Sequence, residues 1–201
     1  MKKELRTLAE YELRAVVEKH ALWLEDNTTG EQANLSGVSL CRANLAGDNL
    51  SRANLKGADL SEADIWNSNL EGANLEGANL WRADFWCTNL SGANLRAAGM
   101  VGADFLSANL SNADLTDAKL TDADFTKANL TGANLSGAEL RAANLSGANL
   151  AGANLTWADL TGAELIGTNL RAANLTDADL SNSILLNTNL TDVDLAGAKQ
   201  E

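Results

Sequence analysis

The sequence predicts an all-β solenoid, a chain wound into stacked coils, and its five-residue rhythm is the main reason. A large apolar residue occupies every fifth position from Leu35 to Leu195 without insertion or deletion, and 28 of these 33 centres are Leu. On an α-helix, steps of five would rotate successive centres by about 140°. On a flat strand, an odd step would send them to alternate sides. The chain must therefore bend at every unit, which gives short extended segments joined by regular turns.

The unusual residues indicate how many units make one coil. Stacked neighbours should be chemically alike, and Phe85, Phe105 and Phe125 lie 20 residues apart. The residue before the centre is also Asn at every twentieth position from Asn49 to Asn189. Four units per coil and a square cross-section follow, with about eight coils. At about 4.8 Å between stacked strands, the rod would be about 40 Å long.

Residues 1–32 precede the repeat, which runs through 33–201, and we expect them to form a capping helix and a linker. An apolar stripe with spacings of three and four predicts a helix over residues 2–24. The stripe consists of Leu5, Leu8, Ala9, Leu13, Val16, Val17, His20 and Leu24. The turn-forming stretch from Asp26 to Gly30 ends it. We expect the stripe to cover the first coil, with His20 in a core or capping role.

Charge and composition exclude several classes of partner. The net charge is −12, so direct binding to nucleic acid or an anionic membrane is disfavoured, whereas a basic protein partner is allowed. No segment is long and apolar enough to span a membrane. The N-terminus lacks the apolar region of a signal peptide, so a cytoplasmic location is expected.

We expect no enzyme, no cofactor and no metal site. His20 is the single histidine, and no catalytic triad can be assembled around it. Straight rows of Asp diverge, whereas a hard cation needs converging oxygens. Cys41 and Cys87 belong to different faces about two coils apart, which excludes a disulfide or a zinc site within one rod.

Two polar series inside and outside the coils are expected to be structural. Asp48 occupies an inward position that is usually Ala, and its stacked neighbours Ser68 and Thr88 are expected to share hydrogen bonds with it. The Asn series from Asn49 to Asn189 is expected to form a ladder of side-chain amides along one face.

The third face, counted from centres Leu35, Leu40, Leu45 and Leu50, is the candidate site. A row of carboxylates precedes its aromatic centres, and large apolar residues follow them. The candidate partner-binding residues are Asp64, Trp66, Trp81, Asp84, Trp86, Asp104, Leu106 and Asp124. Exposed Trp beside acidic groups fits a basic, partly apolar protein surface. Alternatively, the indoles lie flat over the coil and the Asp side chains bond backbone N–H groups of the turns.

The C-terminal coils carry a second apolar group on the same face, namely Ile166, Ile184 and Leu186. The sequence stops at Glu201 with nothing resembling a cap, and an uncovered coil presents unpaired backbone groups. We therefore expect self-association, in a homodimer through the C-terminal coils. A frayed end or a truncated chain is the alternative.

The unit A-(N/D)-L-(S/T/x)-(G/x) resembles that of the pentapeptide-repeat family, over about four-fifths of the chain. The segment LRAVVEKHALWLEDNTTGEQANLSG is similar to the helical leader of many bacterial members. The resemblance implies a right-handed quadrilateral β-helix, with each centre and the small residue two places before it inside.

Two functions stay open, the first drawn from the residues of the third face and the second from the family resemblance. The first is a non-catalytic protein–protein interaction module or scaffold. The alternative is mimicry of DNA, by which some members bind type II topoisomerases and confer some quinolone resistance. Those members often carry projecting loops or a C-terminal dimerising helix, and this sequence shows neither.

Overall fold

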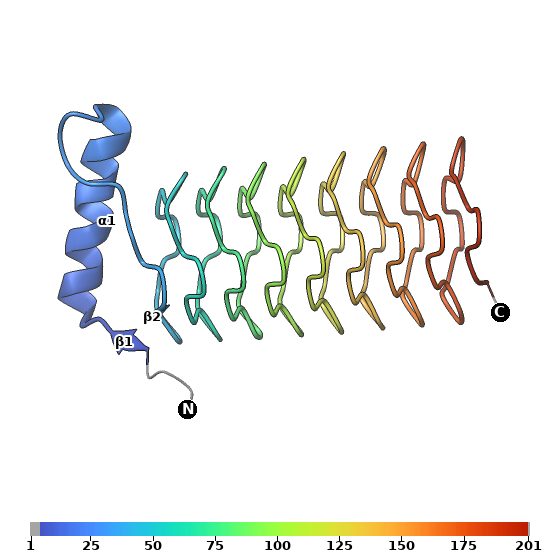
Figure 1. Ribbon diagram of the computed structural model, residues 1–201, viewed down its shortest axis with the longest axis horizontal. Helices are drawn as coiled ribbons and strands as arrows, with labels where there is room; N and C mark the ends of the chain where they lie inside the picture. Colours follow the sequence, from blue (N-terminus) through green and yellow to red (C-terminus); the bar gives the residue numbers. More distant parts are fainter. Residues whose placement is uncertain (1–4, 201) are drawn as a thin grey trace.

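The computed structural model describes residues 5–200, and it shows a straight rod of stacked coils with one helix across its N-terminal end (Figure 1). The named elements are β1 (Arg6–Thr7), α1 (Glu10–Glu25) and β2 (Val38–Ser39). Parallel bridges then join residues 20 apart, from Asn34↔Asn54 to Asp179↔Lys199. The prediction of a right-handed quadrilateral β-helix with four units per coil is confirmed.

Each unit turns the chain in the same way. The N–H of the third residue after a centre donates to the carbonyl of that centre, as from Ala58 to Leu55 at 3.0 Å. The second residue after every centre has a positive φ, which is the geometry of a β-turn with a left-handed third residue. Of these residues 14 are Gly and 19 are not, and eight of the 19 are Asn or Asp, which tolerate this conformation. The glycine rhythm therefore serves the turns.

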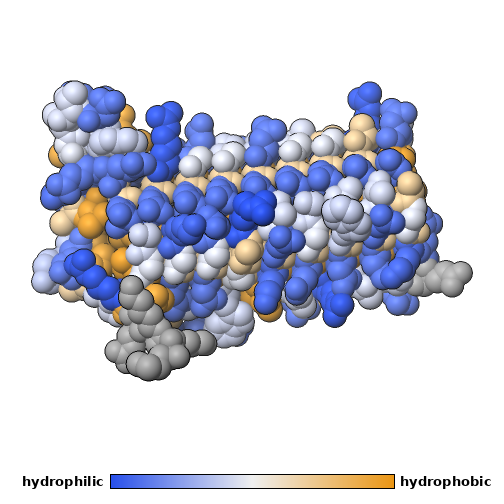
Figure 2. Space-filling view, viewed as in Figure 1, coloured by the Kyte–Doolittle hydropathy of each residue, from blue (hydrophilic) through white to orange (hydrophobic). Residues whose placement is uncertain are grey.

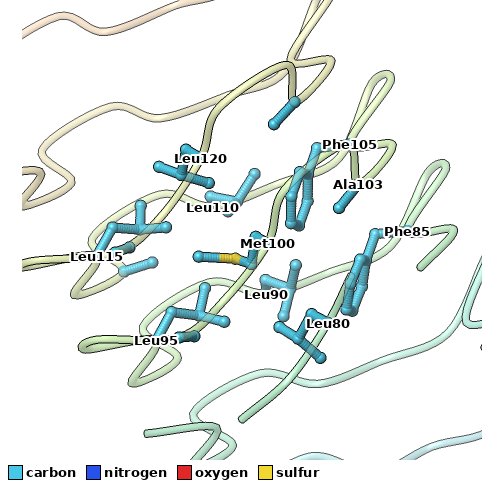
Figure 3. Packing of buried hydrophobic residues seen from close by; sticks show 14 of the residues in the cluster. Leu80, Phe85, Leu90, Leu95, Met100, Ala103, Phe105, Leu110, Leu115 and Leu120 are labelled. Carbon is cyan, nitrogen blue, oxygen red and sulfur yellow. The ribbon is translucent and has the colours of Figure 1, made fainter. Parts of the chain in front are cut away.

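The centres form the core. Every centre from Leu35 to Leu180 is at most 3% exposed, and the small residues two places before them are buried with few exceptions. Phe105 stacks on Phe85 and Phe125, with ring centroids 4.9 and 4.8 Å apart. Figure 3 shows this pattern, with residues of one face lying above one another in successive coils. Because each buried Leu contributes roughly 1.5–3 kcal/mol, this ladder alone is an adequate core.

Some of the small inward residues, two places before a centre, are Thr instead of Ala. Their hydroxyl groups donate hydrogen bonds to backbone carbonyls of the preceding coil. The hydroxyls of Thr88 and Thr168 donate to the carbonyls of Ile65 and Leu145, each at 2.7 Å. Ser68 donates to the same Ile65 carbonyl at 2.6 Å. These hydroxyls therefore need no side-chain partner.

The predicted sharing of hydrogen bonds between Asp48, Ser68 and Thr88 is wrong. The guanidinium of Arg14, on α1, donates to both carboxylate oxygens of Asp48 at 2.9 and 3.2 Å. Asp48 lies in the first coil, where α1 brings a cation within reach, while the hydroxyls of the next coils bond to carbonyls. The inward carboxylate is thus an attachment point for the helix.

The prediction of a helix from residue 2 is wrong for residues 5–9, and residues 1–4 lie outside the described part. The chain is extended at β1, which pairs in parallel with β2 of the first coil. Helix α1 begins only after Ala9, whose N–H donates to the Glu12 carboxylate at 2.8 Å. Pairing with the open edge of the first coil competes successfully with helix propensity, because unpaired strand edges are unfavourable.

The expected amide ladder is present over most of its length. Asn89 donates to Asn69 at 3.0 Å, and the series continues through Asn109 and Asn129. Asn149 departs from it by donating to the Thr131 hydroxyl at 2.9 Å.

Helix α1 covers the first coil through its apolar stripe. Leu13 and His20 are buried, and Val16 and Val17 pack against the core. Figure 2 shows the strongest hydrophobic colour at this junction, while the visible flank of the rod is mostly hydrophilic.

His20 connects α1 to the coil through both ring nitrogens. Nδ1 accepts the N–H of Ala33 at 3.1 Å, so Nε2 carries the proton and donates to the Ser51 carbonyl at 3.0 Å. The ring also stacks on Trp23, with centroids 5.5 Å apart. Burial lowers the pKa of His20, and the Ser51 carbonyl raises it by less. A protonated ring would turn a second N–H toward the N–H of Ala33, so the cap requires neutral histidine.

The cap should therefore weaken in mild acid. The folded pKa of His20 lies below its unfolded value of about 6.5, so the folded protein binds fewer protons at this site. The stability that neutral His20 contributes is fully present above about pH 6.5 and is lost as the pH falls toward the folded pKa. We expect the urea midpoint, followed by Trp fluorescence, to fall between about pH 7 and pH 5.

The control is His20→Gln, which does not titrate. It should be less stable at pH 7 by about 1–3 kcal/mol, because a buried hydrogen-bonding group loses a partner. Its midpoint should change less than that of the parent between pH 7 and pH 5. An equal change in both proteins would contradict the assignment to His20.

Candidate functional site

The third face lies between two columns of turns. In the coil that contains Phe85, the turn at Trp81–Arg82 precedes the third-face segment, and the turn at Trp86–Cys87 follows it. Successive parallel bridges join the residues before the third-face centres, so these residues lie about 4.8 Å apart along the rod. We name four of them the acidic row, consisting of Asp64, Asp84, Asp104 and Asp124.

The carboxylates of the acidic row are held by their own turns. Oδ1 of Asp84 accepts the N–H of Trp86 at 2.9 Å, and Oδ1 of Asp104 accepts that of Leu106 at 2.8 Å. Asp124 does the same with Thr126 at 2.8 Å. The alternative expectation, that these Asp side chains bond turn N–H groups, is confirmed for these three. The bonds use one oxygen of each carboxylate and fix its direction.

The charge of the acidic row is uncompensated. Between residues 5 and 200 there are eight ion pairs, and none includes a member of the row. Eight carboxylates outside the row are paired, as Glu62 is with Arg42 at 3.0 Å. Burial raises the pKa of Asp104, the N–H of Leu106 opposes this, and the charges of Asp84 and Asp124 raise it further. The row is thus a line of mutually repelling charges.

Exposed indoles border the row on both sides. On one side lies a group that we name the aromatic column, formed by Trp66, Trp86 and Leu106 in successive coils. Trp66 and Trp86 are 41% and 45% exposed, with ring centroids 6.4 Å apart and planes inclined by 42°. Trp81 lies at the turn on the other side and is 41% exposed. Each indole is thus partly covered by the rod and partly open to solvent.

A shallow hollow beside Trp81, on the side of the second face, was not predicted from the sequence. It is lined by Trp81, Val101, Asn79, Gly99, Ser61 and Glu62. Gly99 is the one residue immediately before a centre that lacks a side chain. A Cβ added to it would meet only Asn79 Oδ1 at 4.0 Å, so packing does not require glycine. A single Gly in a series of Asn and Asp was the signal that could have identified the hollow.

Trp157 was also missed, and it lies away from the third face. It occupies a turn that follows a first-face centre, is 69% exposed and donates from Nε1 to Asp177 Oδ2 at 3.2 Å. Trp157 is therefore a matched control for the indoles of the third face.

The C-terminal apolar candidates lie further along the third face. Ile166, Ile184 and Leu186 are 36%, 46% and 61% exposed. Ile166 and Leu186 continue the line of the aromatic column, but Thr126 and Ser146 separate them from Leu106. The structure thus presents two apolar groups on one face rather than one continuous strip.

The described residues, 5–200, contain neither a metal-binding cluster nor a membrane-spanning helix. In this range no group of three or more His, Cys, Asp or Glu side chains is arranged to hold a metal ion. No helix within it has the length and apolar character needed to cross a membrane. Cys41 and Cys87 are both free and exposed.

The family described as Pentapeptide repeats matches the chain with eight copies, over residues 31–67, 73–106, 108–147, 138–177 and 173–199. The chain belongs to the pentapeptide-repeat family. A search of curated proteins found no match.

Solved structures of other pentapeptide repeat proteins are similar to the chain. HetL, involved in heterocyst differentiation regulation in the cyanobacterium Nostoc sp. strain PCC 7120, is 37% identical; the match covers 83% of this chain and 82% of HetL, with a TM-score of 0.51. QnrB1, a plasmid-mediated fluoroquinolone resistance protein, is 25% identical over 84% of this chain and 92% of its own, with a TM-score of 0.44. A protein of the Arabidopsis thaliana thylakoid lumen is 32% identical over 60% and 67%, with a TM-score of 0.32.

Replacing Asp104 by Asn should stabilise the rod at neutral pH. Asn accepts the same turn N–H, as it does in most units, and it removes a charge whose pKa is raised by burial and by neighbouring carboxylates. A raised folded pKa means that ionised Asp104 costs stability above that pKa. The gain in urea midpoint should therefore vanish below about pH 3.8, where the carboxyl is protonated in both states.

The matched control is Asp159→Asn, for which the opposite effect on stability is expected. Asp159 immediately precedes a centre of the second face, as Asp104 does on the third. Burial alone would raise the pKa of Asp159, but hydrogen bonds from Thr161 and Arg141 lower it overall. This variant should be less stable than the parent at pH 7. A loss of stability in Asp104→Asn would contradict the repulsion described for the row.

Proposed function

We propose that this chain is a non-catalytic protein–protein interaction module that presents its third face to a protein partner. The carrying observation is the exposed pair Trp66 and Trp86 beside the acidic row. Tryptophan is among the residues that contribute most to binding when an interface buries it. These two indoles are partly exposed and are not needed to fill the core, so binding a partner explains their presence better than packing does.

The rod supports such a role because it is already ordered. Backbone hydrogen bonds join each coil to the next along the third face, as from Phe85 N–H to the Asp104 carbonyl at 2.7 Å. Side chains on this lattice keep their relative positions before a partner arrives, which lowers the entropy cost of association. The similar protein HetL is described as involved in regulation of differentiation, and regulation commonly acts through contacts between proteins.

A second candidate is mimicry of DNA toward a type II topoisomerase. The net charge of −12 on a straight rod favours it. This binding would depend on the carboxylates, whereas the first candidate depends on the indoles as well.

The double variant Trp66→Ser/Trp86→Ser should lose the partner. Immobilised parent protein is incubated with cytoplasmic extract, and the bound proteins are quantified by mass spectrometry. We expect at least one protein to be recovered at least about tenfold less by the double variant, because each buried indole contributes on the order of 2 kcal/mol to binding and about 1.4 kcal/mol is already tenfold in affinity.

Trp157→Ser is the matched control, since it removes an exposed indole from the first face. It should retain the full set of bound proteins. An identical set for all three baits would count against the third face. Recovery of a topoisomerase equally by all three would instead favour mimicry through charge.

We further propose that Ile166, Ile184 and Leu186 mediate association of two copies. These side chains are exposed on one face, and burying exposed apolar surface is the usual driving force for dimers. Leu186→Asp should shift the parent from dimer to monomer in light scattering. Identical masses for parent and variant would argue against this contact, whichever state both adopt.

A further inference from the structure

We propose that the segment bound by the third face is a basic amphipathic α-helix of the partner, lying along the rod axis. This inference rests on the proposed function and specifies the chemistry of the partner. It follows from the arrangement of apolar and acidic groups across this face, from their charge and from their spacing along the rod.

The cross-section of this face is apolar at both edges and acidic between them. The aromatic column forms one edge, and Trp81 with Val101 forms the other. The acidic row runs between these edges, because each of its members lies between the two turns of its coil. A complementary surface is therefore basic along its middle and apolar on both sides.

The charge of the face selects a cation-bearing partner. The acidic row is without ion pairs to residues 5–200, although the chain has 15 Lys and Arg. At the edge formed by Trp81, the guanidinium of Arg82 lies over the Trp81 ring, with Cζ 5.4 Å from the centroid. Lysines or arginines of a partner would relieve the repulsion between these carboxylates, and charge complementarity of this kind also speeds association.

The spacing of the row selects a helix over a strand. The four carboxylates stand at about 0, 4.8, 9.6 and 14.4 Å along the axis. Residues i, i+3, i+7 and i+10 of an α-helix share one face and rise to about 0, 4.5, 10.5 and 15.0 Å, which is within about 1 Å at each step. Alternate residues of an extended strand rise by about 6.7 Å and are already about 2 Å out of step at the second carboxylate.

The contact is therefore about three helical turns long. Basic residues at the four positions would face the acidic row. Apolar residues on one side of that stripe would contact the aromatic column, and those on the other side would contact Trp81 and Val101 at the turns between the second and third faces.

The test uses a synthetic helical peptide of about 18 residues, with Lys at i, i+3, i+7 and i+10 and Leu on both sides of that stripe. Binding is followed by the Trp fluorescence of the full protein, and peptide helicity by circular dichroism. We expect binding that weakens with salt and an increase in peptide helicity. A second peptide of the same composition, with the Lys residues at alternate positions, should bind at least about tenfold more weakly.

Two variants of equal charge locate the contact. Asp84→Asn/Asp104→Asn keeps the turn hydrogen bonds, because Asn fills the same position in most units, and it should weaken binding about tenfold or more. Asp117→Asn/Asp192→Asn removes two carboxylates from turns of other faces and should leave binding within about twofold. Trp66→Ser/Trp86→Ser should also weaken binding.

Equal binding of both peptides, or equal loss in both Asp variants, would show attraction by net charge alone and would overturn the helix proposal. Absence of binding at about 1 mM peptide would overturn it as well. In either case, loss of the extract partner by Trp66→Ser/Trp86→Ser would leave the interaction-module proposal standing. Retention of that partner by the double Trp variant would overturn both the helix proposal and the interaction-module proposal.

Discussion

The structure depends on the backbone hydrogen bonds between successive coils, which join residues 19 and 21 apart and thereby pair residues 20 apart. They place each residue directly beside its equivalent in the next coil, as Asn54 lies beside Asn34 and Asn74. Identical groups then interact with themselves, which favours amide ladders and stacked rings and penalises rows of charge. The Phe stack and the acidic row are therefore consequences of the same register, one stabilising and the other repulsive.

The fold could be predicted because the repeat admits a single backbone solution. A period of five excludes a helix and a flat strand, and the Phe and Asn series determine the number of units per coil. The handedness came from the family resemblance rather than from the pattern itself. The structure of the N-terminal segment was harder to predict, because the sequence around Arg6 has good helix propensity. Only the presence of an unpaired strand edge at Val38–Ser39 explains why the chain is extended there.

The candidate site could be predicted in position but not in its interactions. Periodicity was sufficient to place Trp66, Trp86 and the acidic row on one face. It could not give the exposure of the indoles, nor show that Asp48 pairs with Arg14, because those depend on rotamers and on where α1 crosses the end of the rod. The hollow at Gly99 was not predicted, because it is formed by the absence of a side chain rather than by the presence of one.

The fixed register also determines which changes in length the chain tolerates. Adding or removing one residue within a unit would move every later Leu out of the interior and place polar residues there. Adding 20 residues would insert a whole coil, preserve every stack on both sides and lengthen the rod by about 4.8 Å. Such a chain can lengthen by duplication of whole coils. Each duplication between Trp86 and Leu186 would increase the distance between the aromatic column and the C-terminal apolar group without changing either surface.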